Sequence, residues 1–200
     1  YLVATQRVLR SDDAGETATA QPFWDFNHTA RALALSPSFR EDQTIVAIGN
    51  GVYRSTDGGM TWAAAAGPPP VSADSQGWQA GRLYWNPNGR LYMTISATDG
   101  VAPFRYHTQL WVSADGGQNW SRLRNAPDRP AAGLAAGPSI LGGTDETIYL
   151  STYDNDEVSE PVLAPDLFIS RDSGATWLNL GAAPSGGAKL LAPVDAPDRV

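Results

Sequence analysis

Cysteine is absent from this sequence, and histidine, positive charge and long apolar runs are scarce. Without cysteine there is neither a disulfide framework nor a thiolate metal site, which leaves the redox compartment open. The two histidines, His28 and His107, lie far apart without partners at metal-binding spacing, so a zinc site is not expected. A glycine-rich phosphate loop is also missing. We therefore predict no metal and no cofactor.

The charge balance excludes further classes of partner. Fourteen Lys and Arg residues are scattered along the chain against 21 Asp and Glu, which gives a net charge of -7. Nucleic acids and anionic membrane surfaces both need a cationic footprint, so neither is an expected partner. No apolar run is long enough to cross a bilayer, and the first residues lack the basic and apolar regions of a signal peptide.

The residues that are plentiful favour an all-β chain with many turns. Of the 200 residues, 20 are glycine and 15 are proline, and no long apolar stretch has helical period. Apolar residues make up 42% of the chain, which is enough to bury a sizeable core.

The organising feature is the pattern Ser-x-Asp-x-Gly-x-Thr/Asn-Trp, which occurs three times with its serines 58 and 57 residues apart. A fourth copy near the start has Ala18 in place of the Trp. The positions that define the four copies are Ser11, Asp13 and Gly15; Ser55, Asp57, Gly59 and Trp62; Ser113, Asp115, Gly117 and Trp120; and Ser170, Asp172, Gly174 and Trp177.

Each copy predicts a hairpin corner. An Asp can accept backbone N–H bonds, and a following Gly can adopt the positive φ that other residues resist. Short β-favouring runs at 51–54, 109–112 and 166–169 precede the complete copies, so each copy joins two strands. The Trp at the end of the pattern is expected to fill the seam between neighbouring sheets.

This pattern resembles the Asp box, or bacterial neuraminidase repeat, of sialidases, xyloglucanases, sortilin-type receptors and photosystem II assembly factors. The resemblance implies a β-propeller of four-stranded antiparallel blades, with the box on the turn between the third and fourth strands. It also implies that the box is a structural mark without activity of its own.

Aligned by its boxes, the chain is one β-propeller region, expected to be an incomplete or excerpted ring whose remaining blades belong to the same protein. It divides into a partial blade at 1–20, full blades at about 30–66, 80–124 and 137–181, and a partial blade at 188–200. The expected strands are 31–36, 44–48, 51–55 and 61–65; 81–86, 90–96, 108–113 and 119–124; and 138–141, 146–152, 166–170 and 176–180.

Binding residues are expected on the face opposite the boxes. That face carries the long connections 97–108 and 153–165 and the links between blades near 64–80 and 125–137. Long loops on a rigid scaffold are where binding residues collect. The ligand-binding candidates are Trp78, Asp99, Arg105, Tyr106, His107, Asp154, Asp156 and Glu157.

Two hypotheses of function follow. The leading one is a non-catalytic scaffold, secreted or on the cell envelope, that binds a protein or a glycan. The alternative is a sialidase-like or other glycoside hydrolase whose active site lies partly outside this chain. Phe104-Arg105 matches the first half of the sialidase Phe-Arg-Ile-Pro motif, and the acidic loop 154–160 offers carboxylates for acid and base catalysis or for calcium. A sialidase would bring Arg105 together with further arginines, for which Arg82 and Arg129 are the candidates.

Overall fold

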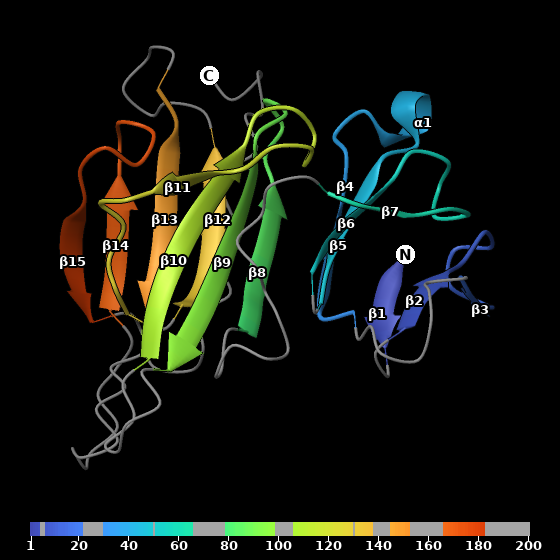
Figure 1. The fold of residues 1–200 in the computed structure, drawn as a ribbon, viewed down its shortest axis with the longest axis horizontal. Helices are drawn as coiled ribbons and strands as arrows, with labels where there is room; N and C mark the ends of the chain where they lie inside the picture. Colours follow the sequence, from blue (N-terminus) through green and yellow to red (C-terminus); the bar gives the residue numbers. More distant parts are fainter. Residues whose placement is uncertain are drawn as a thin grey trace, which may run out of the picture.

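The computed structural model describes residues 1–4, 7–21, 30–49, 51–65, 79–98, 106–129, 131–137, 145–152 and 166–182, and this part of the chain is almost entirely β-sheet. Four antiparallel sheets follow one another along the sequence (Figure 1). The one helix in the described ranges is the short α1 (Phe39–Asp42), between two strands of the second sheet. None of the described helical structure is long and apolar enough to span a membrane.

The strands of every sheet pair in the order in which they occur in the chain, as short connections between antiparallel neighbours dictate. The N-terminal sheet has three strands, and the following three sheets, here called the first, second and third blades, have four each. Their bounds are β1 (Leu2–Ala4), β2 (Arg7–Arg10) and β3 (Thr19–Ala20); β4 (Ala32–Leu35), β5 (Ile45–Ile48), β6 (Val52–Ser55) and β7 (Ala63–Ala64); β8 (Gln79–Trp85), β9 (Leu91–Thr98), β10 (Tyr106–Ser113) and β11 (Ser121–Leu123); and β12 (Ala131–Gly137), β13 (Thr147–Thr152), β14 (Asp166–Ser170) and β15 (Leu178–Ala182).

The all-β, four-stranded antiparallel architecture predicted from the repeat is confirmed, and so is the position of each box between the last two strands of its sheet. Eleven of the twelve expected blade strands begin within about two residues of the observed ones. The expected partial blade at 188–200 lies outside the described residues.

One strand was predicted in the wrong place. The first strand of the third blade was expected at 138–141, but it is β12 at 131–137, a stretch that had been assigned to a connection. Its sequence, Ala-Ala-Gly-Leu-Ala-Ala-Gly, has no β-branched or aromatic residue and so carries little strand propensity. Strand β12 nevertheless pairs with β13 along its length and lies directly beside β8 of the second blade.

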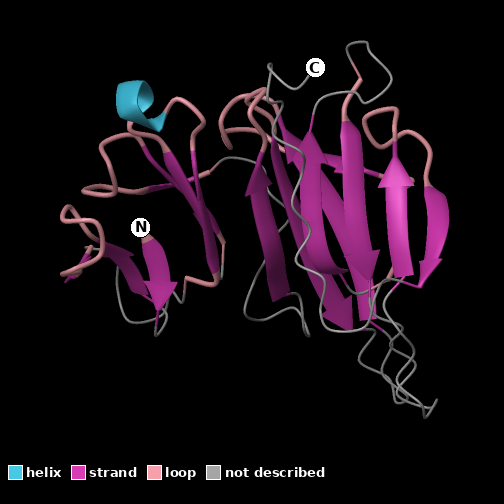
Figure 2. Cartoon of the chain, turned by 180° about the vertical axis from the view of Figure 1, so that it is seen from behind, coloured by secondary structure: helices cyan, strands magenta, loops and turns pink. Residues whose placement is uncertain are grey.

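The blades stand side by side with their first strands adjacent, as Figures 1 and 2 show from opposite sides. Strand β8 contacts β4 on one side and β12 on the other, and β1 of the N-terminal sheet contacts β4. This is the relation that blades of a propeller have to one another.

The hydrophobic core lies in the seams between blades. One cluster joins Val46 and Ile48 of the first blade to Leu91, Met93 and other residues of the second. A second cluster joins the second and third blades through side chains such as Tyr92 and Leu150. Because β9 alternates between the two seams and both of its faces are covered, its first residues are buried without interruption.

Two of the three box tryptophans pack in these seams as predicted. Trp120 belongs to the cluster between the first and second blades and is 8% exposed, and Trp177 packs against the cluster between the second and third. Trp85 and Trp111, which were expected to fill the core or the seam, both pack against the first cluster. Burial of such large side chains is a major source of stability in this fold.

Candidate functional site

The four Asp boxes form corners with the same hydrogen bonds. In the box of the first blade the Ser55 hydroxyl donates to Asp57 Oδ1 at 2.8 Å and accepts from the Gly59 N–H at 2.8 Å. Asp57 in turn accepts from the backbone N–H and the hydroxyl of Thr61, at 2.9 and 2.5 Å. The corners that begin at Ser113 and Ser170 repeat these bonds, with Asn119 and Thr176 in the place of Thr61.

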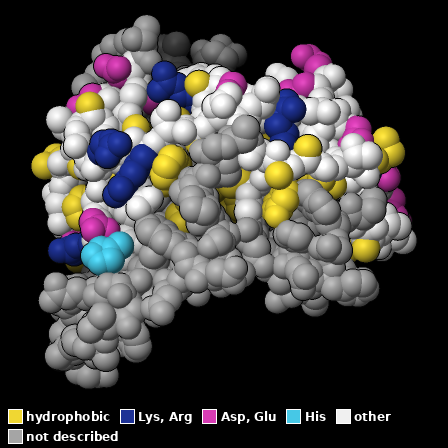
Figure 3. Space-filling model, in the orientation of Figure 1, with side chains coloured by type: hydrophobic (Ala, Val, Ile, Leu, Met, Phe, Trp, Pro, Cys, Tyr) yellow, Lys and Arg dark blue, Asp and Glu magenta, His cyan; other side chains and the backbone are white. Residues whose placement is uncertain are grey.

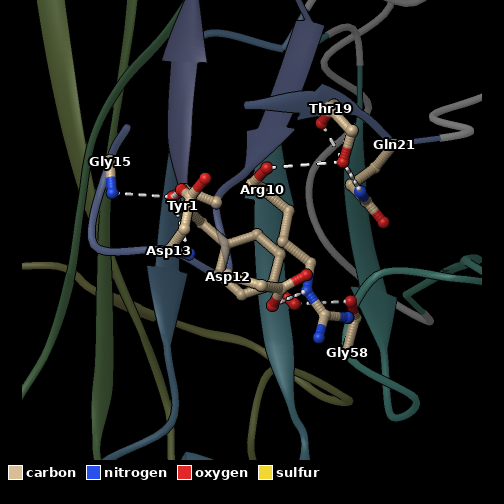
Figure 4. Close-up of polar contacts among 9 residues, drawn as sticks. Tyr1, Arg10, Asp12, Asp13, Gly15, Thr19, Gln21 and Gly58 are labelled. Carbon is tan, nitrogen blue, oxygen red and sulfur yellow. Dashed lines mark hydrogen bonds and ion pairs between the residues drawn. The ribbon is translucent and has the colours of Figure 1, made fainter. Parts of the chain in front are cut away.

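The degenerate copy has the same corner although Ala18 replaces its Trp. Ser11 donates to Asp13 at 2.7 Å and accepts from the Gly15 N–H at 2.7 Å, and Thr17 donates to Asp13. Asp13 and Gly15 of this corner are labelled in Figure 4. The corner thus forms without the Trp, although in the complete boxes the indole also bonds to the turn: Trp62 Nε1 donates to Gly59 O at 3.0 Å. The corner and the indole are therefore separate parts of the repeat.

The hydrogen bonds fix the charge of the box carboxylates. The bonds from Thr61 lower the pKa of Asp57 to about 2, and those from Thr17 and Thr176 do the same for Asp13 and Asp172. For Asp115 burial raises the pKa, but the bonds from Asn119 and Ser113 lower it by more. A carboxylate that stays ionised and already accepts several bonds is a poor general acid at neutral pH, so these residues hold the turn.

Each box is also attached to the sheet before it. The Tyr1 hydroxyl of the N-terminal sheet donates to Gly58 O at 2.7 Å (Figure 4), and Arg54 Nε of the first blade donates to Gly116 O of the second at 3.0 Å. A shallow hollow of about 360 Å³ brings 36–38 and 87–89 beside the box residues 114–116. The β4–β5 and β8–β9 connections therefore share the face of the boxes, as expected for this topology.

Of the eight predicted ligand-binding residues, six lie outside the described residues. These are Trp78, Asp99, Arg105, Asp154, Asp156 and Glu157. The convergence of Arg105 with other arginines, which would mark a sialidase, is likewise still a prediction.

Tyr106 and His107 were placed in a loop at 97–108, and this placement was wrong. The β9–β10 ladder continues further than expected, with Tyr106 paired to Thr98 and His107 to Ala97. The strands lengthen because Tyr106 and Thr108 have good strand propensity and the ladder supplies partners for their backbone groups. His107 thus stands on a rigid strand.

The His107 ring is held by an aspartate that was not among the sequence candidates. His107 Nδ1 lies 2.8 Å from Asp128 Oδ2, and the Thr108 N–H donates to Asp128 Oδ1 at 3.0 Å. The side chains of His107 and Asp128 are 45% and 58% exposed, so solvent screens this ion pair. The second bond nevertheless anchors the carboxylate, and the carboxylate orients the imidazole.

The next residue along the chain forms a second polar group. Arg129 donates from NH1 to Asp166 Oδ2 at 2.7 Å, and Asn179 Nδ2 donates to the same oxygen at 3.2 Å. Because β10 and β14 both begin at the face opposite the boxes, Asp128 and Arg129 join the second and third blades there. Sequence reasoning named Arg129 but missed Asp128, Asp166 and Asn179, since nothing in their neighbourhoods marks them.

A buried carboxylate, also missed, lies between the second and third blades on the side of the boxes. Glu146 is 4% exposed and accepts hydrogen bonds from Asn86 Nδ2 and the Tyr92 hydroxyl, with Arg90 NH1 3.6 Å away. Burial, followed by the bond to Glu146, raises the pKa of Tyr92. All of these polar groups have partners within the protein, so the network connects two blades.

The described surface has two further properties that bear on ligands. On the face seen in Figure 3, basic and acidic side chains occur at several separate places among apolar ones. Among the described residues no three His, Cys, Asp or Glu side chains are grouped so that they could hold a metal ion.

The corners and the blades together define a protein of the Asp-box β-propeller type, and comparison with known proteins agrees. The BNR/Asp-box repeat model matches residues 53–64 and 111–122. The two matched boxes have Gly58 and Gly116 at the left-handed position of the turn, whereas the two unmatched ones have Ala14 and Ser173 there, at φ 57° and 56°. The same corner thus forms with a less typical sequence.

Beyond the repeat, the chain is similar to xyloglucanases. A xyloglucanase from Paenibacillus sp is 29% identical over an alignment of 184 residues, which covers 78% of this chain and 16% of that protein. The crystal structure of the GH74 xyloglucanase from Xanthomonas campestris matches 88% of this chain and 27% of its own, at 16% identity and a TM-score of 0.60. A protein of unknown function from Dyadobacter fermentans matches 85% of this chain and 56% of its own, at 21% identity and a TM-score of 0.54.

The chain therefore carries the BNR/Asp-box repeat and is a distant homologue of the xyloglucanase propeller. It spans about a sixth of the length of the Paenibacillus relative, so it corresponds to a fraction of such an enzyme.

Proposed function

We propose that the protein containing this chain is a glycoside hydrolase that acts on a xyloglucan-type polysaccharide, and that this chain forms part of its propeller. The observation that carries the proposal is the 29% identity to a xyloglucanase over 184 residues. The family model for the repeat matches only two short segments, so the corners alone do not account for a similarity of this extent. This supports the hydrolase alternative over the purely non-catalytic scaffold.

The face opposite the boxes is the proposed side of the polysaccharide site. The box carboxylates have their bonding capacity used by Ser, Thr and backbone groups, whereas His107 and Arg129 are anchored from one side and partly exposed. Xyloglucan is an uncharged polymer recognised through its hydroxyl groups, so a net charge of -7 does not oppose its binding. A polymer of this size is met outside the cell, which supports a secreted or envelope location.

The test uses the full-length protein with xyloglucan, measuring both binding and the release of reducing ends. We expect hydrolysis, and we expect His107→Ala to lower kcat/KM by about tenfold because a positioned hydrogen-bonding group is lost. The control is Glu16→Gln, at an exposed position in the degenerate box of the N-terminal sheet.

Three outcomes would contradict the proposal in different ways. Binding without release of reducing ends would favour the non-catalytic scaffold. Release of sialic acid from a sialoside would favour the sialidase form of the alternative. A protein that neither binds nor cleaves xyloglucan would refute the assignment altogether.

A further inference from the structure

An open groove of about 390 Å³ separates the first and second blades near their outer strands. One wall consists of β7 and the residue after it, Ala63, Ala64 and Ala65, together with the half-buried indole of Trp62. The other wall carries Gln118 and Asn119, from the box of the second blade, and Arg54 lies between the two.

The repeat shows why this seam is hollow. Three residues after the box Trp, the first blade has Ala65 where the second blade has Leu123. Leu123 fills the next seam so closely that a Cβ on Gly174 would stand 2.8 Å from its Cδ1. In the seam between the first and second blades the equivalent Gly117 meets Val46 instead, since a Cβ there would stand 2.8 Å from Val46 Cγ2. The short side chain of Ala65 leaves the seam open only nearer the outer strands, where the groove lies.

The wall of the groove that the second blade contributes is also more polar than the equivalent surface of the third blade. Gln118 and Asn119 occupy the positions that Ala175 and Thr176 have in the third blade. Their amide nitrogens donate to Asp115, at 3.2 Å to its carbonyl and 2.7 Å to its carboxylate, which fixes both side chains. The bond from Nε to Gly116 O fixes the Arg54 guanidinium in the same way. Held amides leave their oxygens as acceptors for a ligand's hydroxyl groups.

We infer that this groove is a second glycan subsite, which takes a sugar unit of the same polysaccharide away from the proposed hydrolytic face. An indole beside oriented amide and guanidinium groups is suited to a flat ring that bears hydroxyls, and no Asp or Glu is among the lining residues. The alanines of β7 leave room for a ring to approach. The inference rests on the proposed function, because that function supplies the polysaccharide.

The test changes the groove into the closed form that the chain already uses. Ala65→Leu copies Leu123, and Gln118→Ala copies Ala175, so both variants introduce residues that the repeat tolerates at these positions. Affinity for xyloglucan oligosaccharides is measured by calorimetry on the full-length protein. Thermal unfolding verifies the fold, and Ala175→Gln serves as the matched control in the other seam.

We expect Ala65→Leu to weaken oligosaccharide binding by about tenfold without lowering Tm, and Ala175→Gln to leave binding unchanged. If wild type binds and Ala65→Leu binds equally well, the subsite is refuted while the proposed function stands. If wild type binds xyloglucan through no site at all, both are refuted. If Ala65→Leu keeps its affinity for the sugar but loses affinity for a peptide that wild type binds, the groove binds protein and the glycan subsite is refuted.

Discussion

At the scale of single residues, the box depends on its Ser, its Asp and its second Gly more than on the rest of the pattern. The four corners make the same bonds although one lacks the Trp and two have Ala14 or Ser173 at the first left-handed position. The hydroxyl and the carboxylate together satisfy the backbone N–H groups of a turn that faces solvent. A residue in the left-handed region costs about 1 kcal/mol, which these bonds offset.

A pH titration tests the role of the carboxylate. Asp57 has a pKa of about 2 in the folded protein against an ordinary value of 3.8, so its contribution is complete above pH 3.8 and is lost as pH falls towards 2. We expect Asp57→Asn to lower the free energy of unfolding at pH 7 by about 1 kcal/mol and to lose less stability in acid than wild type. Urea unfolding between pH 2 and 7 measures both; parallel curves would rule out this role.

At the scale of secondary-structure elements, the sequence predicts the strands best where a box fixes their register. The third strand of every blade ends at the box Ser, so β6, β10 and β14 end at the predicted residue. Strand β12 was misplaced because its small residues carry little strand propensity, and its pairing with β13 and its contact with β8 are visible only in the structure. Tertiary contacts therefore place this strand where its local sequence does not.

The fit between β11 and the next box can be tested with a glycine pair. Gly174 has φ 92° and would bring a Cβ to 2.8 Å from Leu123, whereas Gly15 has φ 98° and nothing within 4 Å. Gly15→Ala should cost about 1 kcal/mol from backbone strain alone, and Gly174→Ala about 2 to 3 kcal/mol because overpacking is added.

In a Leu123→Ala background the two glycine substitutions should cost the same, because the contact that distinguishes them is gone. Chemical denaturation of the three single and two double variants gives the comparison. A Gly174→Ala penalty that persists undiminished without Leu123 would show that the seam contact is not its cause.

At the scale of the whole molecule, successive seams are closed by different means. The first and second blades meet through apolar side chains and leave a groove, while the second and third enclose Glu146 and its partners. These partners, Asn86 and Tyr92, are 60 and 54 residues away from Glu146 in the chain. The sequence alone does not indicate this network, since it depends on how two blades are placed.

Removing the buried carboxylate should loosen the seam between the second and third blades. Glu146→Ala leaves the Asn86 amide and the Tyr92 hydroxyl buried without their acceptor, and we expect a loss of about 3 kcal/mol in the free energy of unfolding. Tyr92→Phe, which removes one donor, should cost about 1 kcal/mol.

Hydrogen exchange gives the location of this effect, with faster exchange expected in β12 and β13 than in β5 and β6. Equal acceleration in all blades would instead indicate that Glu146 affects overall stability and not this one seam.

The face opposite the boxes could be anticipated from the topology. The loops that join the second and third strands of each blade must lie on the same side as the links between blades. Which side chains meet there could not be anticipated. His107 was a predicted binding residue, but the prediction placed it on a loop, whereas it lies on β10, and did not name Asp128 as its partner. Spacing along the chain does not specify which side chain of a connection folds back onto a strand.

The bonds from Tyr1 to Gly58 and from Arg54 to Gly116 run in one direction, each from a sheet to the corner of its successor. A gene segment that encodes one such unit can consequently be duplicated in tandem, because the box of the new copy offers the carbonyl to which the preceding sheet donates its hydrogen bond. Rings of different circumference can evolve in this way from a single ancestral module.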